Sequence, residues 1–183
     1  MKRTVRYGVF ETNSSSMHSL TVGDGYIFPA SSLKIETIDN RVCVEFGEFG
    51  WEIKDYYDPI NKLSYLLTMV AETECHGLPN KEEFYETEGF KLIDEAIADY
   101  CNCDGICIDE NDISIKEWNY DGETHKYFDH EGYIDHQSCE DYKNLKDFLD
   151  YNGCDVIGFI FNEGVVLHTD NDNYWEETYE ETN

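Results

Sequence analysis

The sequence is poor in basic residues and in proline, and it contains no long apolar run. It has 13 Lys and Arg against 40 Asp and Glu, for a formal net charge of −27 in 183 residues. Binding to nucleic acid needs cations that neutralise phosphates, so we expect no direct binding to DNA or RNA. No run approaches the ~18 apolar residues of a membrane span, and anionic lipid would repel this charge. We therefore expect no membrane association either.

The ends of the chain and the cysteines bear on the compartment. Residues 1–11 have a basic start but no apolar stretch to follow it, so we expect no signal peptide. The seven cysteines are an odd number. These features predict a reducing cytosol, in which the thiols are free or metal-bound.

Negative charge is what the chain has in excess. The first six residues hold three bases and no acid, which leaves −30 for the remainder. On duplex DNA, 27 charges span ~46 Å, and a globule of this length has a diameter of about 40 Å. A surface of that charge density can occupy a nucleic-acid channel on another protein. The alternative is an acidic protein whose charge only keeps it dispersed.

The composition predicts a folded protein despite this charge. Hydrophobic residues make up 40% and aromatic residues 15% of the chain, and only three prolines occur. That content supplies a core and argues against disorder. We expect a single α+β domain over residues 1–175, with a mostly antiparallel sheet and about three helices packed on it. Residues 176–183 are expected to form a frayed acidic end.

Periodicity predicts the individual elements. Alternating residues predict strands at 33–38 and 42–46, joined as a hairpin at Asp39-Asn40. Apolar residues spaced by three and four predict three helices, which begin near Asp58-Pro59, near Asn80 and near Glu140. Asn152-Gly153 is expected to end the third helix. The apolar run Val156–Phe161 predicts a central strand. Further strands are expected near 6–10, 19–22, 105–118, 133–134 and 165–168, whereas most of 119–139 has no clear assignment.

Three polar clusters could supply acid–base chemistry. In the first, Asn13–Ser19, Ser15 would be a nucleophile and His18 its base. The others, each holding His and Asp, are 129–139, which contains Asp135 and His136, and His168–Asp172. The alternative is a structural polar turn at 13–19 and solvated loops elsewhere. No Gly-x-Ser-x-Gly elbow is present to mark a nucleophile.

The spacing of three cysteines raises the question of a metal. Cys101, Cys103 and Cys107 follow the pattern C-x-C-x3-C, and Cys139 could be a fourth thiolate ligand for a structural zinc. His136, Cys75 or His76 are other candidates for the fourth ligand. No second clustered pair at zinc-finger spacing occurs, so the expectation is that the protein has no cofactor.

The segment Arg6–Leu20, which reads RYGVFETNSSSMHSL, resembles the start of small uncharacterised proteins from phages and mobile elements of gut Firmicutes. Ile134–Ser138 and Thr169–Asp172 are similar to later parts of the same pattern. In size and acidity the chain also resembles phage anti-CRISPR proteins, in particular type II-A inhibitors of Cas9. The resemblance implies a location in the cytosol of a host bacterium, and it supplies no catalytic residue.

The leading hypothesis is a non-enzymatic inhibitor that mimics nucleic acid. It would bind a basic groove of a host nucleic-acid-processing protein, such as Cas9 with its guide RNA, and exclude target DNA. The candidate contact residues are acids and aromatics in three stretches: Glu82, Glu83, Glu86, Glu88; Asp109, Glu110, Asp112; and Asp170, Asp172, Tyr174, Trp175, Glu176, Glu177. One alternative is a small hydrolase or transferase that uses Ser15, His18, Asp135 and His136. Another is a structural or dimerising phage protein.

Overall fold

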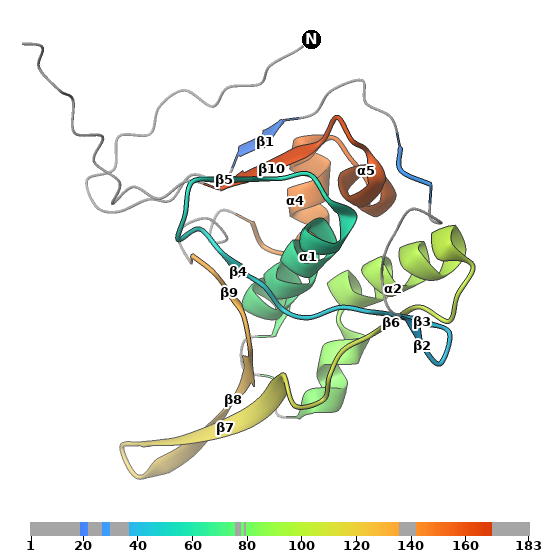
Figure 1. Ribbon diagram of the computed structural model, residues 1–183. Helices are drawn as coiled ribbons and strands as arrows, with labels where there is room; N and C mark the ends of the chain where they lie inside the picture. The colour runs from blue at the N-terminus through green and yellow to red at the C-terminus, as the bar shows by residue number, and fades with distance from the viewer. Residues whose placement is uncertain are drawn as a thin grey trace, which may run out of the picture.

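The computed structural model describes residues 19–21, 27–29, 37–75, 78, 80–135 and 142–169. Helices and small sheets are interspersed along these residues, and four of the six strand pairings are antiparallel (Figure 1). The predicted α+β class is therefore confirmed.

Helix α1 (Pro59–Glu74) lies at the centre of the fold and contacts α2, α4, α5 and β9. The helix begins at Asp58-Pro59 as predicted, and Asp58 caps it, because its Oδ1 accepts a hydrogen bond from the backbone N of Asn61 at 2.9 Å. Pro59 occupies the first turn, where no N–H is needed. Leu63, Leu66 and Val70 recur on its buried side with no exposed surface, so α1 forms the middle of the core.

The helix expected from residue 80 to residue 100 is divided in two. A 3-10 helix η2 (Lys81–Glu86) precedes α2 (Glu88–Cys101), and Thr87 between them is extended. The Thr87 Oγ1 accepts a hydrogen bond from the N of Phe90 at 3.3 Å, so this residue ends η2 and caps α2. Helix α4 (Leu145–Asn152) ends at Gly153 with a φ of 66°, as the Asn-Gly pair predicted.

The strand predicted at Val156–Phe161 is wrong, because these residues form helix α5. Asp155 caps the helix by accepting a hydrogen bond from the N of Gly158 at 2.6 Å. The run packs against α1 and α2, and Phe159, Ile160 and Phe161 have no exposed surface. A short apolar run is equally suited to a buried helix, and here the cap and the packing determine the outcome.

The strands form four small sheets in the described residues, in place of one. Strand β10 (Val166–Thr169) lies between β1 (Ser19–Thr21) and β5 (Lys54–Tyr56). The other sheets are β2 (Thr37–Ile38) with β3 (Arg41–Cys43) and β6 (Ile106–Cys107); β4 (Glu48–Phe49) with β9 (Tyr133–Ile134); and β7 (Ile113–Tyr120) with β8 (Glu123–His130).

Several of the predicted strands are present in these sheets. The hairpin at Asp39-Asn40 is confirmed, and both residues have positive φ, as a tight hairpin turn requires. The expected strands at 19–22, near 133–134 and at 165–168 are confirmed by β1, β9 and β10. Among the described residues, no helix combines the length and the apolar character needed to cross a membrane.

Candidate partner-binding surface

The acidic loop Asp109–Asp112 has a defined turn conformation. The Asp109 Oδ1 accepts hydrogen bonds from the backbone N of Asn111 at 2.9 Å and from its Nδ2 at 2.7 Å. The backbone O of Asp109 accepts from the N of Asp112 at 2.9 Å, and the O of Asp112 accepts from the N of Glu131 at 2.8 Å. The loop is thus joined to the end of β8, which brings Glu131 to its acids.

Helix η2 lies against this loop and brings the first predicted acidic stretch to the second. The Lys81 Nζ donates a hydrogen bond to the backbone O of Glu110 at 2.8 Å, and η2 contacts β7. Glu82 is exposed beside the loop, whereas Glu83 is partly buried and accepts a hydrogen bond from the Nδ2 of Asn80 at 2.7 Å. Two sequence segments about 25 residues apart therefore form one acidic surface.

Not every predicted acid is free in this surface. Glu86 forms an ion pair with Lys91 at 2.7 Å, and Glu88 is the first residue of α2. We call the exposed or partly exposed acids around the Asp109–Asp112 loop the acidic cluster. Four of them were predicted, one more comes from the loop after β3, and one from the end of β8. Its members are Glu45, Glu82, Asp109, Glu110, Asp112 and Glu131.

Burial and the neighbouring negative charges both disfavour the ionised form of Asp112. Burial raises the pKa of the Asp112 carboxyl, and the negative charges of Glu131, Asp109 and Glu45 raise it further. The pKa of Tyr85 beside the loop is also raised, first by burial and then by Glu110. An open pocket of about 450 Å³ lies next to these residues, between Glu110, Tyr85 and Arg41. The cluster is a site at which a cationic partner would relieve an existing repulsion.

We expect Asp112→Asn to stabilise the protein modestly at pH 7. Because the folded state raises the pKa of Asp112, its ionised form opposes folding above that pKa, and this cost is absent below its ordinary value of 3.8. Removal of the charge should raise the free energy of unfolding by up to about 1 kcal/mol at pH 7 and by nothing below pH 3.5. Urea unfolding at both pH values measures this. Glu123→Gln, at an exposed acid near the distant hairpin tip, is the control that also replaces a carboxylate with an amide, and an equal gain there would contradict the explanation.

Strands β7 and β8 form a hairpin that extends from the body of the molecule (Figure 1). Asp121 and Gly122 form its turn, with φ of 50° and 82°. Eight cross-strand pairs run from Ile113 opposite His130 to Tyr120 opposite Glu123. Because side chains alternate, the hairpin has two distinct faces.

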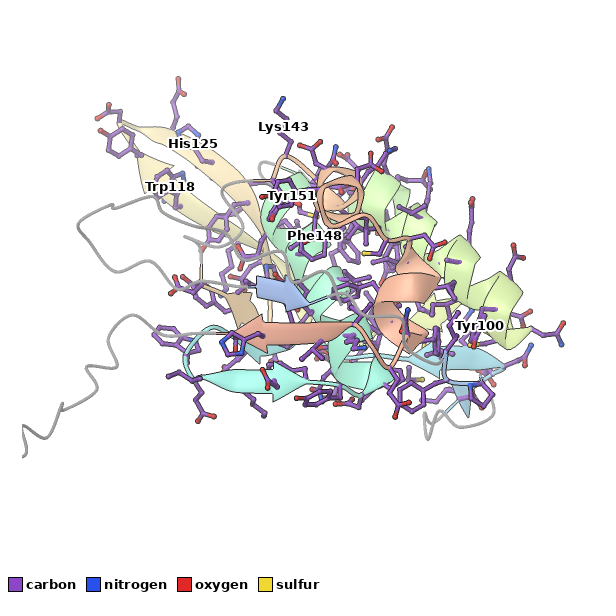
Figure 2. All side chains as sticks on the ribbon, turned by 90° about the horizontal axis from the view of Figure 1, so that it is seen from above. Tyr100, Trp118, His125, Lys143, Phe148 and Tyr151 are labelled. Atoms are coloured by element: carbon purple, nitrogen blue, oxygen red, sulfur yellow. The ribbon has the colours of Figure 1, made fainter. Side chains whose placement is uncertain are left out.

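One face of the hairpin carries exposed aromatic side chains. Trp118, Tyr120 and Tyr127 are 56%, 62% and 41% exposed. Trp118 stacks on Tyr120 at a centroid distance of 5.9 Å and meets the ring of His125 edge-on at 5.9 Å. Figure 2 shows Trp118 and His125 on the part of the hairpin that lies outside the body. Exposed Trp and Tyr are typical of protein interfaces, so this aromatic face is a second candidate contact surface.

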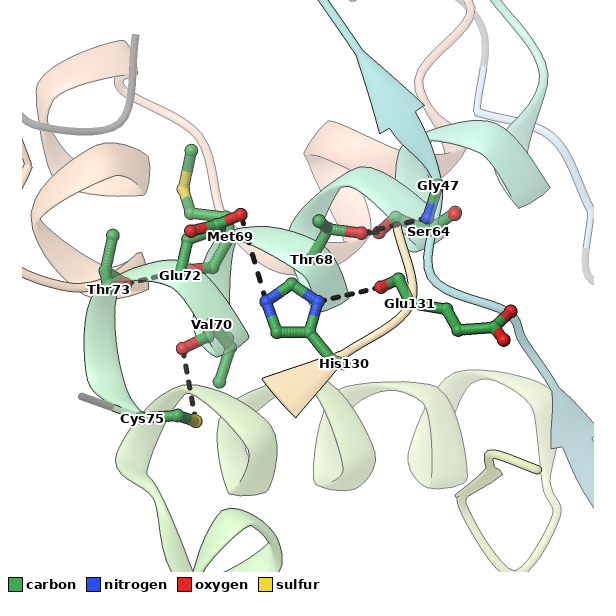
Figure 3. Close-up of polar contacts among 10 residues, drawn as sticks. All are labelled: Gly47, Ser64, Thr68, Met69, Val70, Glu72, Thr73, Cys75, His130 and Glu131. Atoms are coloured by element: carbon green, nitrogen blue, oxygen red, sulfur yellow. Dashed lines mark hydrogen bonds and ion pairs between the residues drawn. The ribbon is translucent and has the colours of Figure 1, made fainter. Parts of the chain in front are cut away.

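His130 attaches the base of the hairpin to the body. Its Nδ1 donates a hydrogen bond to the backbone O of Glu131 at 2.7 Å, and its Nε2 lies 3.8 Å from the carboxylate of Glu72 on α1 (Figure 3). The ring also packs on Phe46 and Phe128, at centroid distances of 5.1 and 6.1 Å. The side chain is only 10% exposed. His130 is thus a structural residue at the junction between the hairpin and the acidic cluster.

We expect His130→Ala to lower the free energy of unfolding by about 1–3 kcal/mol. The substitution removes the packing of a largely buried ring on Phe46 and Phe128, together with one hydrogen bond. His125→Ala removes a histidine from the same strand where it is exposed, and its effect should stay within about 0.5 kcal/mol. Urea unfolding of the two variants provides the comparison, and equal effects would contradict the role assigned to His130.

Of the other predicted polar residues, His168 lies in the sheet β1–β10–β5. The His168 Nδ1 lies 2.6 Å from the Asp55 Oδ1, and Tyr57 donates a hydrogen bond to the other Asp55 oxygen at 3.1 Å. The hydrogen bond from His168 lowers the pKa of Asp55, which burial opposes. Ser19 lies opposite His168 on β1. The segment 13–18 therefore leads into a strand beside a His–Asp pair, whose side chains are 33% and 45% exposed.

Asp135 follows β9 and is held against β4, in another sheet. Its backbone N donates a hydrogen bond to the O of Phe49 at 3.1 Å, and Trp51 stacks on Tyr133 at 5.8 Å. Thr169 Oγ1 donates to the O of Glu52 at 2.9 Å, which joins β10 to the same loop. Several predicted residues lie outside the described residues: Ser15, His18, His136, Cys139, Asp170, Asp172, Tyr174, Trp175, Glu176 and Glu177.

Among the described residues, Cys101 and Cys103 lie near one another, but Cys107 has a different neighbour. Cys107 is on β6 next to Cys43, whereas the Cys103 Sγ contacts the backbone O of Gly105 at 3.5 Å after the end of α2. Among the described residues, no group of three His, Cys, Asp or Glu side chains is arranged to hold a metal ion. A zinc site that includes Cys139 stays a prediction.

The aromatic hairpin was not predicted from the sequence, and neither were Glu45 and Glu131 of the acidic cluster. The Asp121-Gly122 pair between alternating residues was a usable signal for the hairpin. Glu45 and Glu131 are single acids outside acidic runs, so no sequence signal places them. Comparisons of the chain with models of protein families, with curated proteins and with solved structures found no match.

Proposed function

We propose that this protein is a non-enzymatic inhibitor that binds the basic nucleic-acid groove of a host nuclease in the bacterial cytosol. Guide-loaded Cas9 is the specific target that we propose, because it holds its heteroduplex in a positively charged channel. Occupation of that channel would exclude target DNA. The observation that carries the proposal is the acidic cluster, in which two separate acidic stretches and two isolated acids gather at the base of a protruding hairpin.

Two properties of this surface suit a basic partner. Burial raises the pKa of Asp112, and the charges of Glu131, Asp109 and Glu45 raise it further; a cationic groove would offset the part that comes from repulsion. The net charge of −27 would also accelerate association by electrostatic steering. The aromatic face of the hairpin would add contacts that do not depend on charge, because Trp and Tyr stack on arginine guanidinium groups.

Inhibition of DNA cleavage by guide-loaded Cas9 tests the proposal. The wild-type protein should block cleavage, and the triple variant Glu82→Gln, Glu110→Gln, Glu131→Gln should inhibit at least tenfold more weakly. The matched control Glu95→Gln, Asp99→Asn, Glu163→Gln removes the same charge from exposed acids outside the cluster and should change inhibition less than threefold. No inhibition by the wild type would overturn the choice of target. Equal losses in the two variants would overturn the role of the cluster.

A second candidate function is a small hydrolase or transferase, which the His168–Asp55 pair favours. A histidine oriented by a carboxylate can act as a general base for a serine, and β1 brings the end of the 13–19 segment beside His168. A fluorophosphonate probe tests this, since it labels activated serines. Labelling that is lost in His168→Ala and retained in His125→Ala would support an enzyme. An unlabelled wild-type protein would argue against a serine nucleophile.

A further inference from the structure

Two cysteines from distant parts of the sequence lie side by side in the sheet β2–β3–β6. Cys43 on β3 is paired directly with Cys107 on the parallel strand β6. Their Sγ atoms are 2.7 Å apart, which is closer than two unbonded thiols normally approach. Both side chains are partly exposed, so a small molecule can reach them.

The backbone already satisfies the requirements of a disulfide at this position. Neighbouring strands lie about 4.7–4.9 Å apart, and disulfides form when the Cα atoms are about 4.4–6.8 Å apart. The pairing is fixed on both sides of the cysteines, because Val42 N donates to Gly105 O at 2.9 Å and Val44 N donates to Cys107 O at 3.0 Å. No strand has to move for the sulfur atoms to bond.

We propose that Cys43 and Cys107 form a reversible dithiol site that is oxidised to an intramolecular disulfide by small-molecule disulfides of the glutathione class. The Cys43 thiolate attacks one sulfur of the oxidised tripeptide, whose S–S bond breaks, and the first reduced thiol leaves with the proton that Cys43 lost. The Cys107 thiolate then attacks the Cys43 Sγ and displaces the second thiol, which takes the proton from Cys107. The two protein thiols lose two electrons and the reagent gains them.

The second attack is intramolecular, because the paired strands β3 and β6 hold the two sulfur atoms side by side. Burial raises the pKa of Cys75 to about 12 and that of Cys154 to about 11, which makes these thiols poor competitors.

The disulfide would have a structural consequence beside the acidic cluster. It would join residues 64 positions apart and fix β6 to β3, two residues before Asp109. Closure of a loop of this length restricts the unfolded chain. We expect the oxidised protein to melt about 5–10 °C higher than the reduced protein. This inference is independent of the proposed function, because it requires no partner.

Thiol counting by mass spectrometry tests the proposal. The fully reduced protein, incubated natively with oxidised glutathione and then denatured and alkylated, should accept five alkyl groups in place of its seven. Peptide mapping should find Cys43 linked to Cys107. Cys101→Ser, the matched control, should keep this link, whereas Cys43→Ser should lose both the link and the rise in melting temperature. Seven free thiols, a stable glutathione adduct on either cysteine, or a link between other cysteines would overturn the proposal.

Discussion

Phe84→Ala is expected to lower the free energy of unfolding by about 3–5 kcal/mol. Phe84 has no exposed surface although it lies on the short helix η2. Its ring stacks on Phe128 of β8 at a centroid distance of 5.3 Å and meets Phe46 at 6.0 Å and Phe90 at 5.1 Å. A single side chain thus contacts η2, the hairpin and α2 together, so its removal leaves a cavity among three elements.

Urea unfolding at pH 7 measures this loss, and Phe84→Leu separates cavity formation from the loss of aromatic contacts. Leucine fills most of the volume, so Phe84→Leu should cost less than about half as much. Tyr120→Ala is the exposed aromatic control and should change stability by less than about 0.5 kcal/mol. A loss below 1 kcal/mol for Phe84→Ala would show that η2 is not anchored through this ring.

Lys62→Met is expected to stabilise the protein by about 2 kcal/mol at pH 7. Lys62 has no exposed surface, and its Nζ donates a hydrogen bond to the backbone O of Asn162 at 3.1 Å. Burial lowers the pKa of its amine to about 8 from 10.5, which corresponds to a cost of about 3 kcal/mol below pH 8. Methionine carries no charge and removes that cost, but loss of the hydrogen bond to Asn162 offsets the gain by about 1 kcal/mol.

The stability difference between Lys62→Met and the wild type should depend on pH. Between pH 8 and 10.5 the unfolded protein binds the Lys62 proton more tightly than the folded protein, so the wild type gains stability as the pH rises. The advantage of Lys62→Met should therefore shrink over this window and disappear at about pH 9.5, where the cost of burial equals the ~1 kcal/mol of the lost hydrogen bond. Near pH 10.5 the variant should be the less stable protein. Lys143→Met, at an exposed lysine, is the control and should have no effect at either end. An advantage that is independent of pH would contradict the assigned cost of burial.

The sequence predicted those elements whose signals are local. Asp58-Pro59 and Asn152-Gly153 marked the beginning of α1 and the end of α4, because caps act within one turn of the helix. It did not predict α5, since the apolar run at 156–161 suits a strand and a buried helix alike. The two-residue parallel pairing of β4 with β9 depends on contacts across 85 residues, and no local signal specifies it.

The candidate site was predictable only in part, because the contacts that assemble it join residues far apart in the sequence. The runs at 82–88 and 109–112 showed where acids are dense, but their contact depends on Lys81 and on the packing of Phe84. Glu45 and Glu131 join them because β3 and β8 end nearby, which the sequence does not reveal. The third acidic stretch, 170–177, lies outside the described residues, so its part in the surface stays a prediction.

The salt dependence of binding to guide-loaded Cas9 tests the central claim most directly. Charges on a surface are screened over about 8 Å at physiological ionic strength and over shorter distances at higher salt. If the acidic cluster replaces nucleic acid in a basic groove, the dissociation constant should rise at least 100-fold between 50 and 500 mM NaCl. A dissociation constant that stays constant across this range, or no binding at 50 mM, would contradict the account.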